Sequence, residues 1–100
     1  MEKTSKKPKV LIVDDEPINI FFLEGILSEE GLEVCTASDG MDALSKVTEF
    51  KPDVIMLDIM MPGMSGIEVL EKVIANPEIC HIPVIGVGSR NGKFYTLRIN

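Results

Sequence analysis

Three acidic side chains stand where two apolar segments of the sequence end. Residues 54–57 are an unbroken apolar run, which is typical of a strand buried on both faces in a parallel sheet, and the run ends at Asp58. Residues 9–13 form a second apolar strand, which ends at Asp14 and Asp15. Functional groups of open α/β sheets lie just beyond the carboxyl ends of the strands. We therefore expect the three carboxylates to converge at one edge of a sheet.

The chemistry that such a cluster suits is the binding of a divalent cation. Carboxylates held close together repel one another unless a cation lies between them. Hard oxygen ligands of this kind suit Mg²⁺. The alternative interpretation is that Asp14, Asp15 and Asp58 only cap helices or line a solvated loop. A pair and a single acid at the ends of two apolar strands favour the metal site.

The rest of the chain alternates between strands and helices that are joined by short links. We expect strands over 9–14, 33–37, 54–57 and 83–87, and helices over 17–30, 40–50 and 66–75. Pro17 suits a first helical turn, and Gly31 is typical of a helix end. This alternation predicts an α/β fold, a doubly wound parallel sheet built from right-handed crossovers.

The spacing of apolar residues predicts which side of each helix packs on the sheet. For the first helix we expect a stripe with a period of four and the residues that widen it: Ile18, Phe22 and Ile26, with Phe21, Leu23 and Leu27. For the second helix the expected inward residues are Ala43, Leu44 and Val47. For the third they are Ile67, Leu70 and Ile74, with Val69 and Val73 beside them.

Composition narrows the class of protein. One hundred residues with 45% hydrophobic side chains make one small globular domain. A net charge of −6 argues against a nucleic-acid-binding surface. Residues 1–8 are polar and basic, which predicts a flexible tail, and no apolar stretch approaches the roughly 20 residues of a membrane span. Cys35 and Cys80 form no CxxC pair, which indicates reduced thiols and a cytoplasmic protein.

Three segments together match a known family. They are Val13-Asp14-Asp15-Glu16-Pro17, the run from Asp53 to Gly66, and Ala37-Ser38-Asp39-Gly40 with Ala43 and Leu44. Over about residues 9–87 the sequence resembles the receiver domain of two-component response regulators, of the chemotaxis-regulator type. The combination of an acidic doublet after one strand and a D-x-x-M-P-x-M-x-G loop after another is highly specific. The resemblance implies a flavodoxin-like receiver fold.

The resemblance also implies a function and a role for each acid. Asp58 would accept a phosphoryl group from a phosphohistidine on a sensor histidine kinase or a phosphotransfer protein, forming an acyl phosphate. Asp15, Asp58 and the backbone carbonyl of Met60 would bind Mg²⁺ directly, and Asp14 would act mostly through water. The protein would then be a signalling phosphoacceptor in a phosphorelay rather than an enzyme, although it would assist its own phosphorylation and dephosphorylation.

The sequence departs from the family after the fourth strand. Gly88 stands at the position of the family's Thr or Ser, and Ser89 follows as a tentative substitute for the hydroxyl. The family continues with a helix, a strand that ends in a lysine and a final helix, whereas residues 90–100 do not resemble that continuation. Asn91-Gly92 instead predicts a hairpin turn.

Residues 94–99 are therefore interpreted as a strand that is antiparallel to the fourth, as an arm exchanged with another chain, or as an unstructured tail. Because an antiparallel strand begins at the active edge, Lys93 is a tentative substitute for the family's lysine. We expect a tail over 1–8, a receiver-like domain over 9–89 and an atypical hairpin or arm over 90–100.

Three functions remain open at this point. The first is the phosphoacceptor. The second is a degenerate or truncated receiver that acts as a dimeric interaction module without phospho-switching. Without the helices that the family has after its fourth strand, apolar surface would stay exposed. We therefore expect a homodimer, either with or without elements swapped between the two chains. The third is a metal-dependent hydrolase with an Asp nucleophile, which is least favoured because its usual second acid is replaced by Met60.

Overall fold

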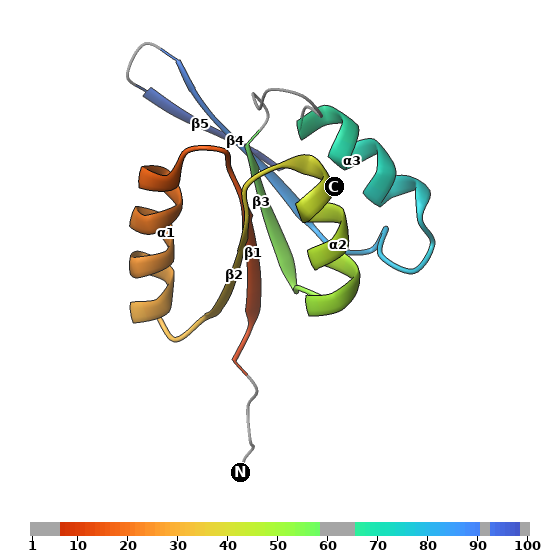
Figure 1. The fold of residues 1–100 in the computed structure, drawn as a ribbon, viewed down its shortest axis with the longest axis horizontal. Coiled ribbons are helices and arrows are strands. Elements are labelled where there is room, and N and C mark those ends of the chain that lie inside the picture. The colour runs from red at the N-terminus through yellow and green to blue at the C-terminus, as the bar shows by residue number, and fades with distance from the viewer. Residues whose placement is uncertain (1–6, 59–65, 91–92, 99–100) are drawn as a thin grey trace.

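The computed structural model describes residues 7–58, 66–90 and 93–98, which form one sheet with helices on both faces (Figure 1). The strands are β1 (Lys9–Val13), β2 (Glu33–Ala37), β3 (Val54–Asp58), β4 (Val84–Arg90) and β5 (Lys93–Arg98). The helices are α1 (Pro17–Glu29), α2 (Gly40–Phe50) and α3 (Gly66–Ala75). Most of the predicted tail over 1–8 lies outside the described residues.

The sheet has the strand order β2-β1-β3-β4-β5. The pairs β1–β2, β1–β3 and β3–β4 are parallel, whereas β5 pairs antiparallel with β4 of the same chain. The predicted doubly wound parallel sheet with an antiparallel edge strand is therefore confirmed. The alternative of an unstructured tail is wrong for residues 93–98.

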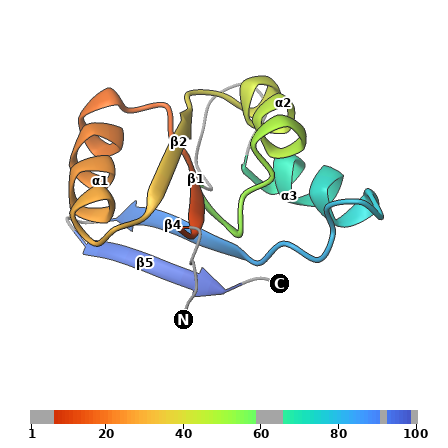
Figure 2. The same ribbon diagram turned by 90° about the horizontal axis from the view of Figure 1, so that it is seen from below.

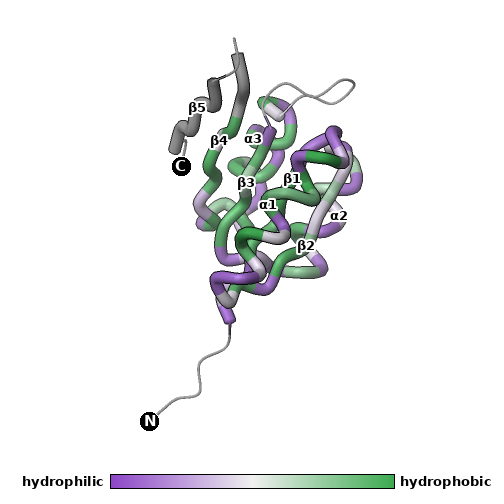
Figure 3. Tube along the Cα trace, turned by 90° about the vertical axis from the view of Figure 1, so that its left-hand side faces the viewer, coloured by the Kyte–Doolittle hydropathy of each residue, from purple (hydrophilic) through white to green (hydrophobic). Residues whose placement is uncertain are grey.

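The helices are divided unequally between the two faces of the sheet (Figure 2). α1 lies beside β1 and β2 on one face, and α2 and α3 cover the other. The main hydrophobic core lies under α2 and α3 and includes Leu11, Ile55 and Val84. Figure 3 shows that hydrophobic residues dominate along β1 and β3. No described helix covers β3 and β4 on the α1 side.

The predicted helix ends have clear local causes. Gly31 adopts a φ of 84°, a left-handed conformation that favours glycine. Its N–H donates to the carbonyl of Ser28, and the N–H of Leu32 donates to the carbonyl of Leu27, each within 3.2 Å. These two hydrogen bonds form a Schellman motif, which ends α1. At the start of α2, the carboxylate of Asp39 accepts a hydrogen bond from the Asp42 N–H at 2.8 Å.

The predicted inward stripe of α1 is largely wrong. Ile18 and Phe21 are each 77% exposed, Phe22 is 69% exposed and Ile26 is 52% exposed. The half-buried side chains that face the sheet are Ile20, Leu23 and Leu27. Because apolar residues occur all around this helix, a period of four could not identify the side that meets β1 and β2. Only the expectation for Leu23 and Leu27 is confirmed.

Two further expectations about packing need correction. In α3 the buried residues are Val69, Leu70 and Val73, while Ile67 and Ile74 are 46% and 50% exposed. Helix α3 meets the sheet through one narrow side, so the wider stripe that includes these two isoleucines stays in solvent. For α2 the expected inward residues, Ala43, Leu44 and Val47, are confirmed.

Strand β3 is buried on one face rather than on both. Ile55 and Leu57 are buried, whereas Val54 and Met56 are only half-buried. The buried pair faces the core under α2 and α3. The other face lacks a covering helix among the described residues, which explains the difference.

The backbone of Lys51 offers a test of local strain. Lys51 follows α2 with a φ of 54°, a conformation that costs a residue with a Cβ roughly 1 kcal/mol. We expect Lys51→Gly to raise the free energy of unfolding by about 0.5–1 kcal/mol in urea denaturation. Lys72→Gly, in the exposed interior of α3, should instead lower it by about 1 kcal/mol. Equal effects of the two substitutions would contradict this explanation.

Candidate functional site

The site depends on the parallel pairing of β1 with β3. Val13 is opposite Leu57, so the residues that follow, Asp14 and Asp58, come level at the carboxyl edge. At the other edge the Lys9 N–H donates to Oδ2 of Asp53 at 2.7 Å, and the Asp53 N–H donates to the Lys9 carbonyl at 2.8 Å. These two bonds hold the register, and a slip by one residue would turn every side chain of the strand to the opposite face.

The three predicted acids meet at this edge. One carboxylate oxygen from each of Asp14, Asp15 and Asp58 lies within 4.8 Å of the other two. Asp14 is buried, with 7% of its surface exposed, and Asp15 and Asp58 are half-buried. The structure thus brings together residues that lie more than forty positions apart in the sequence.

Asp14 is held in place by the start of α1. Its Oδ1 accepts a hydrogen bond from the Glu16 N–H at 2.9 Å, and its Oδ2 accepts one from Nδ2 of Asn19 at 3.3 Å. The Asp14 N–H donates to the carbonyl of Ala37 at 3.0 Å. Sequence reasoning missed Asn19. Its signal was a polar residue in the first turn of an otherwise apolar helix, directly after the acidic doublet.

The donor set fits a hard divalent cation. Two like charges about 5 Å apart repel by roughly 3 kcal/mol at an effective dielectric constant near 20. A cation between the carboxylates offsets this repulsion, and a set that contains only oxygen atoms favours Mg²⁺ over softer metals. Both oxygens of Asp14 already accept protein hydrogen bonds, at 2.9 Å and 3.3 Å.

The remaining predicted site residues are placed only in part. Met60 lies in the segment 59–65, outside the described residues, so its carbonyl is not located. On the backbone, Asp58 pairs with Val87, and Gly88 and Ser89 follow it in β4, with Ser89 opposite Phe94. Gly88 thus comes directly after the residue that is level with Asp58.

Strands β4 and β5 both extend past the end of β3. Lys93 is opposite Arg90, three residues beyond Val87, which is about 10 Å past the level of Asp58 along the strand. Thr96, which sequence reasoning did not single out, is opposite Val87 and is therefore level with Asp58, two strands away. The roles suggested for Ser89 and Lys93 stay predictions.

Comparison with known proteins identifies the family. Residues 10–99 match the response regulator receiver domain, so the chain belongs to that family. It is 36% identical over 94 residues to Protein PilG of Pseudomonas aeruginosa, covering 94% of this chain and 70% of that protein. It is 42% identical over 85 residues to Response regulator PleD of Caulobacter vibrioides, covering 85% of this chain but only 19% of PleD.

Solved structures agree with the assignment. The Vibrio cholerae chemotaxis protein CheY4 is 34% identical, with a TM-score of 0.78 over 81% of this chain and 68% of that one. The N-terminal domain of a receiver protein from Methanoculleus marisnigri is 35% identical, with a TM-score of 0.77 over 78% of this chain and 63% of that chain. These likenesses confirm the predicted receiver fold.

Removal of one charge from the cluster should stabilise the protein when no divalent cation is present. Without Mg²⁺, we expect Asp58→Asn to raise the free energy of unfolding by about 1–3 kcal/mol, because two repulsive pairs disappear. That corresponds to a Tm increase of roughly 5–15 °C for a domain of this size. Melting curves in chelator should show it, while Glu49→Gln on the exposed side of α2 should have little effect.

Added Mg²⁺ should raise the Tm of the original protein more than that of Asp58→Asn, because the variant has lost a ligand. An equal response of both proteins would show that the cluster does not bind the cation through Asp58.

Proposed function

We propose that Asp58 is the phosphoacceptor of this receiver domain and takes its phosphoryl group from a phosphohistidine on a sensor histidine kinase or phosphotransfer protein, with Mg²⁺ as cofactor. Membership in the receiver family supports this role. The observation that carries the proposal is the convergence of Asp14, Asp15 and Asp58 within 4.8 Å at the carboxyl edge of the sheet.

The proposed reaction exchanges one bond to phosphorus for another. A carboxylate oxygen of Asp58 attacks the phosphorus, and the P–N bond to the histidine breaks as the P–O bond of the acyl phosphate forms. The imidazole leaves with the electron pair of the broken bond and takes up a proton. A bound Mg²⁺ supplies positive charge that offsets the repulsion between the phosphoryl group and the acids.

The three acids have different roles in this proposal. Asp15 and Asp58 would bind the cation directly, with the carbonyl of Met60 as a further ligand. Asp14, which is tied to Glu16 and Asn19, would act through water and keep the start of α1 against the site.

A second candidate function is a receiver that forms an interaction module without a phospho-switch. Two observations favour it. Gly88 stands directly after the residue level with Asp58, where the family has a hydroxyl. The strand beyond β4 is antiparallel, so it cannot bring a lysine to the site from the family's direction. The intact set of three acids favours the phosphoacceptor, and the replacement of a second acid by Met60 disfavours a hydrolase.

Assembly and location form a further part of the proposal. The exposed apolar side chains of α1 and the edge strand β5 support a homodimer. The net charge of −6 supports the absence of a nucleic-acid partner. A cytoplasmic location stays a prediction.

Among the described residues, no helix combines the length and the apolar character needed to cross a membrane.

Phosphorylation by acetyl phosphate tests the function directly. In the presence of Mg²⁺ we expect the intact mass to rise by one phosphoryl group, and we expect no increase in chelator or in Asp58→Asn. Glu49→Gln, on the exposed side of α2, also removes one negative charge and should still be phosphorylated. If the folded protein gains no phosphoryl group, the interaction module becomes the better assignment.

The tentative roles of Lys93 and Ser89 need a separate measurement. If these residues contact the phosphoryl group, Lys93→Ala and Ser89→Ala should each change the rate of phosphorylation or the lifetime of the acyl phosphate several-fold. Lys72→Ala on α3 serves as the matched control, since Lys72 is exposed on another element. Rates and lifetimes equal to those of the original protein would exclude both residues from the site.

A further inference from the structure

The outward side of α1 is the most apolar exposed surface that the described residues form on a single helix. We call the set Ile18, Phe21, Phe22, Gly25 and Ile26 the α1 outer face. Its four large side chains are between 52% and 77% exposed, and no residue of α1 is fully buried. Apolar clusters of this kind on a small protein mark interaction sites.

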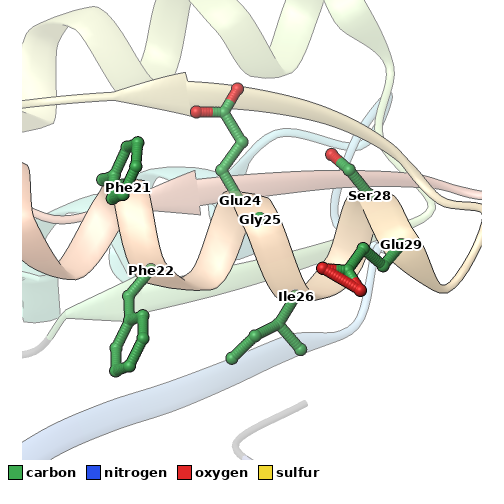
Figure 4. A pocket seen from close by; sticks show the side chains of 7 residues that line it. All are labelled: Phe21, Phe22, Glu24, Gly25, Ile26, Ser28 and Glu29. Atoms are coloured by element: carbon green, nitrogen blue, oxygen red, sulfur yellow. The ribbon is translucent and has the colours of Figure 1, made fainter.

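The centre of the α1 outer face is a hollow at Gly25. A surface hollow of about 430 Å³ is lined by Phe21, Phe22, Glu24, Gly25, Ile26, Ser28 and Glu29 (Figure 4). A Cβ at Gly25 would meet nothing within 4 Å, so no neighbour in the described part of the chain requires glycine there. Glycine inside a helix lowers stability relative to alanine. A bare backbone at this position leaves room for the close approach of another surface.

The α1 outer face is complementary to itself. Figure 4 shows Phe21 and Phe22 pointing to opposite sides of the helix, one turn before the bare backbone of Gly25. A two-fold axis between positions 22 and 25 would set a second α1 antiparallel to the first. Each Phe22 would then lie against Gly25 of the other copy. A two-fold interface requires that the same patch carry both a projecting side chain and a hollow that receives the side chain of the other copy.

We propose that two copies of this chain dimerise through antiparallel packing of their α1 outer faces. The inference rests on the homodimer proposed above and assigns its surface. It does not depend on phosphorylation of Asp58.

The available area is sufficient for a weak dimer. With roughly 150–250 Å² for a large apolar side chain, the exposed parts of the four side chains amount to about 500 Å² per copy. Two copies would bury about 1,000 Å², which is near the lower limit for a specific interface. Met56, Ile85 and Val87 are half-buried on the sheet face that no described helix covers, and they extend the apolar surface beside α1.

Sedimentation equilibrium of the whole chain between about 5 and 500 µM tests the proposal. We expect a dimer with a Kd in the micromolar range. Gly25→Gln should weaken it at least ten-fold, because the new side chain fills the hollow, and should raise the Tm of the monomer, because glutamine favours helix. Phe22→Ser should also weaken it. Met41→Gln, which replaces an apolar residue that is 68% exposed on α2, should leave the Kd unchanged.

A monomer at about 500 µM would overturn both this inference and the proposed homodimer. A dimer that is unaffected by Gly25→Gln and Phe22→Ser would overturn this inference alone. It would favour an interface at the edge strand β5 instead. Neither result bears on the proposed phosphorylation of Asp58, which is measured separately.

Discussion

Parallel pairing of β1 with β3 in one register is the constraint on which the site depends. It brings Asp14 and Asp15 from one strand end beside Asp58 from the other, and it is held at the opposite edge by the bonds between Lys9 and Asp53. The pairing also places the repulsion among three acids at the carboxyl edge of the sheet. A cation bound between these acids would offset a repulsion that the fold itself creates.

The unequal cover of the sheet shapes the rest of the molecule. α2 and α3 bury one face, whereas α1 alone lies over β1 and β2 on the other. Strand β3 is therefore buried on one side only, and the side chains of Phe22 and Ile26 remain in solvent. The helix that connects directly to the acidic site through Asn19 is thus also the helix with the most exposed apolar surface.

The antiparallel β5 separates the phosphoryl site from the usual means of transmitting its state. In the receiver pattern, a hydroxyl after the fourth strand and a lysine after a parallel fifth strand contact the phosphoryl group. Here Gly88 occupies the first position, and β5 runs in the opposite direction. A charge change at Asp58 therefore has fewer contacts through which it could bias a second conformation.

The sequence by itself determined the elements and the acids, because both depend on local chemistry. Gly31 and Asp39 mark helix ends through their own backbone and side-chain bonds, and the acids follow directly after apolar strands. The turn at Asn91-Gly92 likewise predicted an antiparallel strand as one of three interpretations. Only the tertiary structure decided which side of α1 faces the sheet, because its apolar residues surround the helix and spacing alone does not select among them. The same holds for the separation of the three carboxylates, which strand order and register set and which no single segment contains.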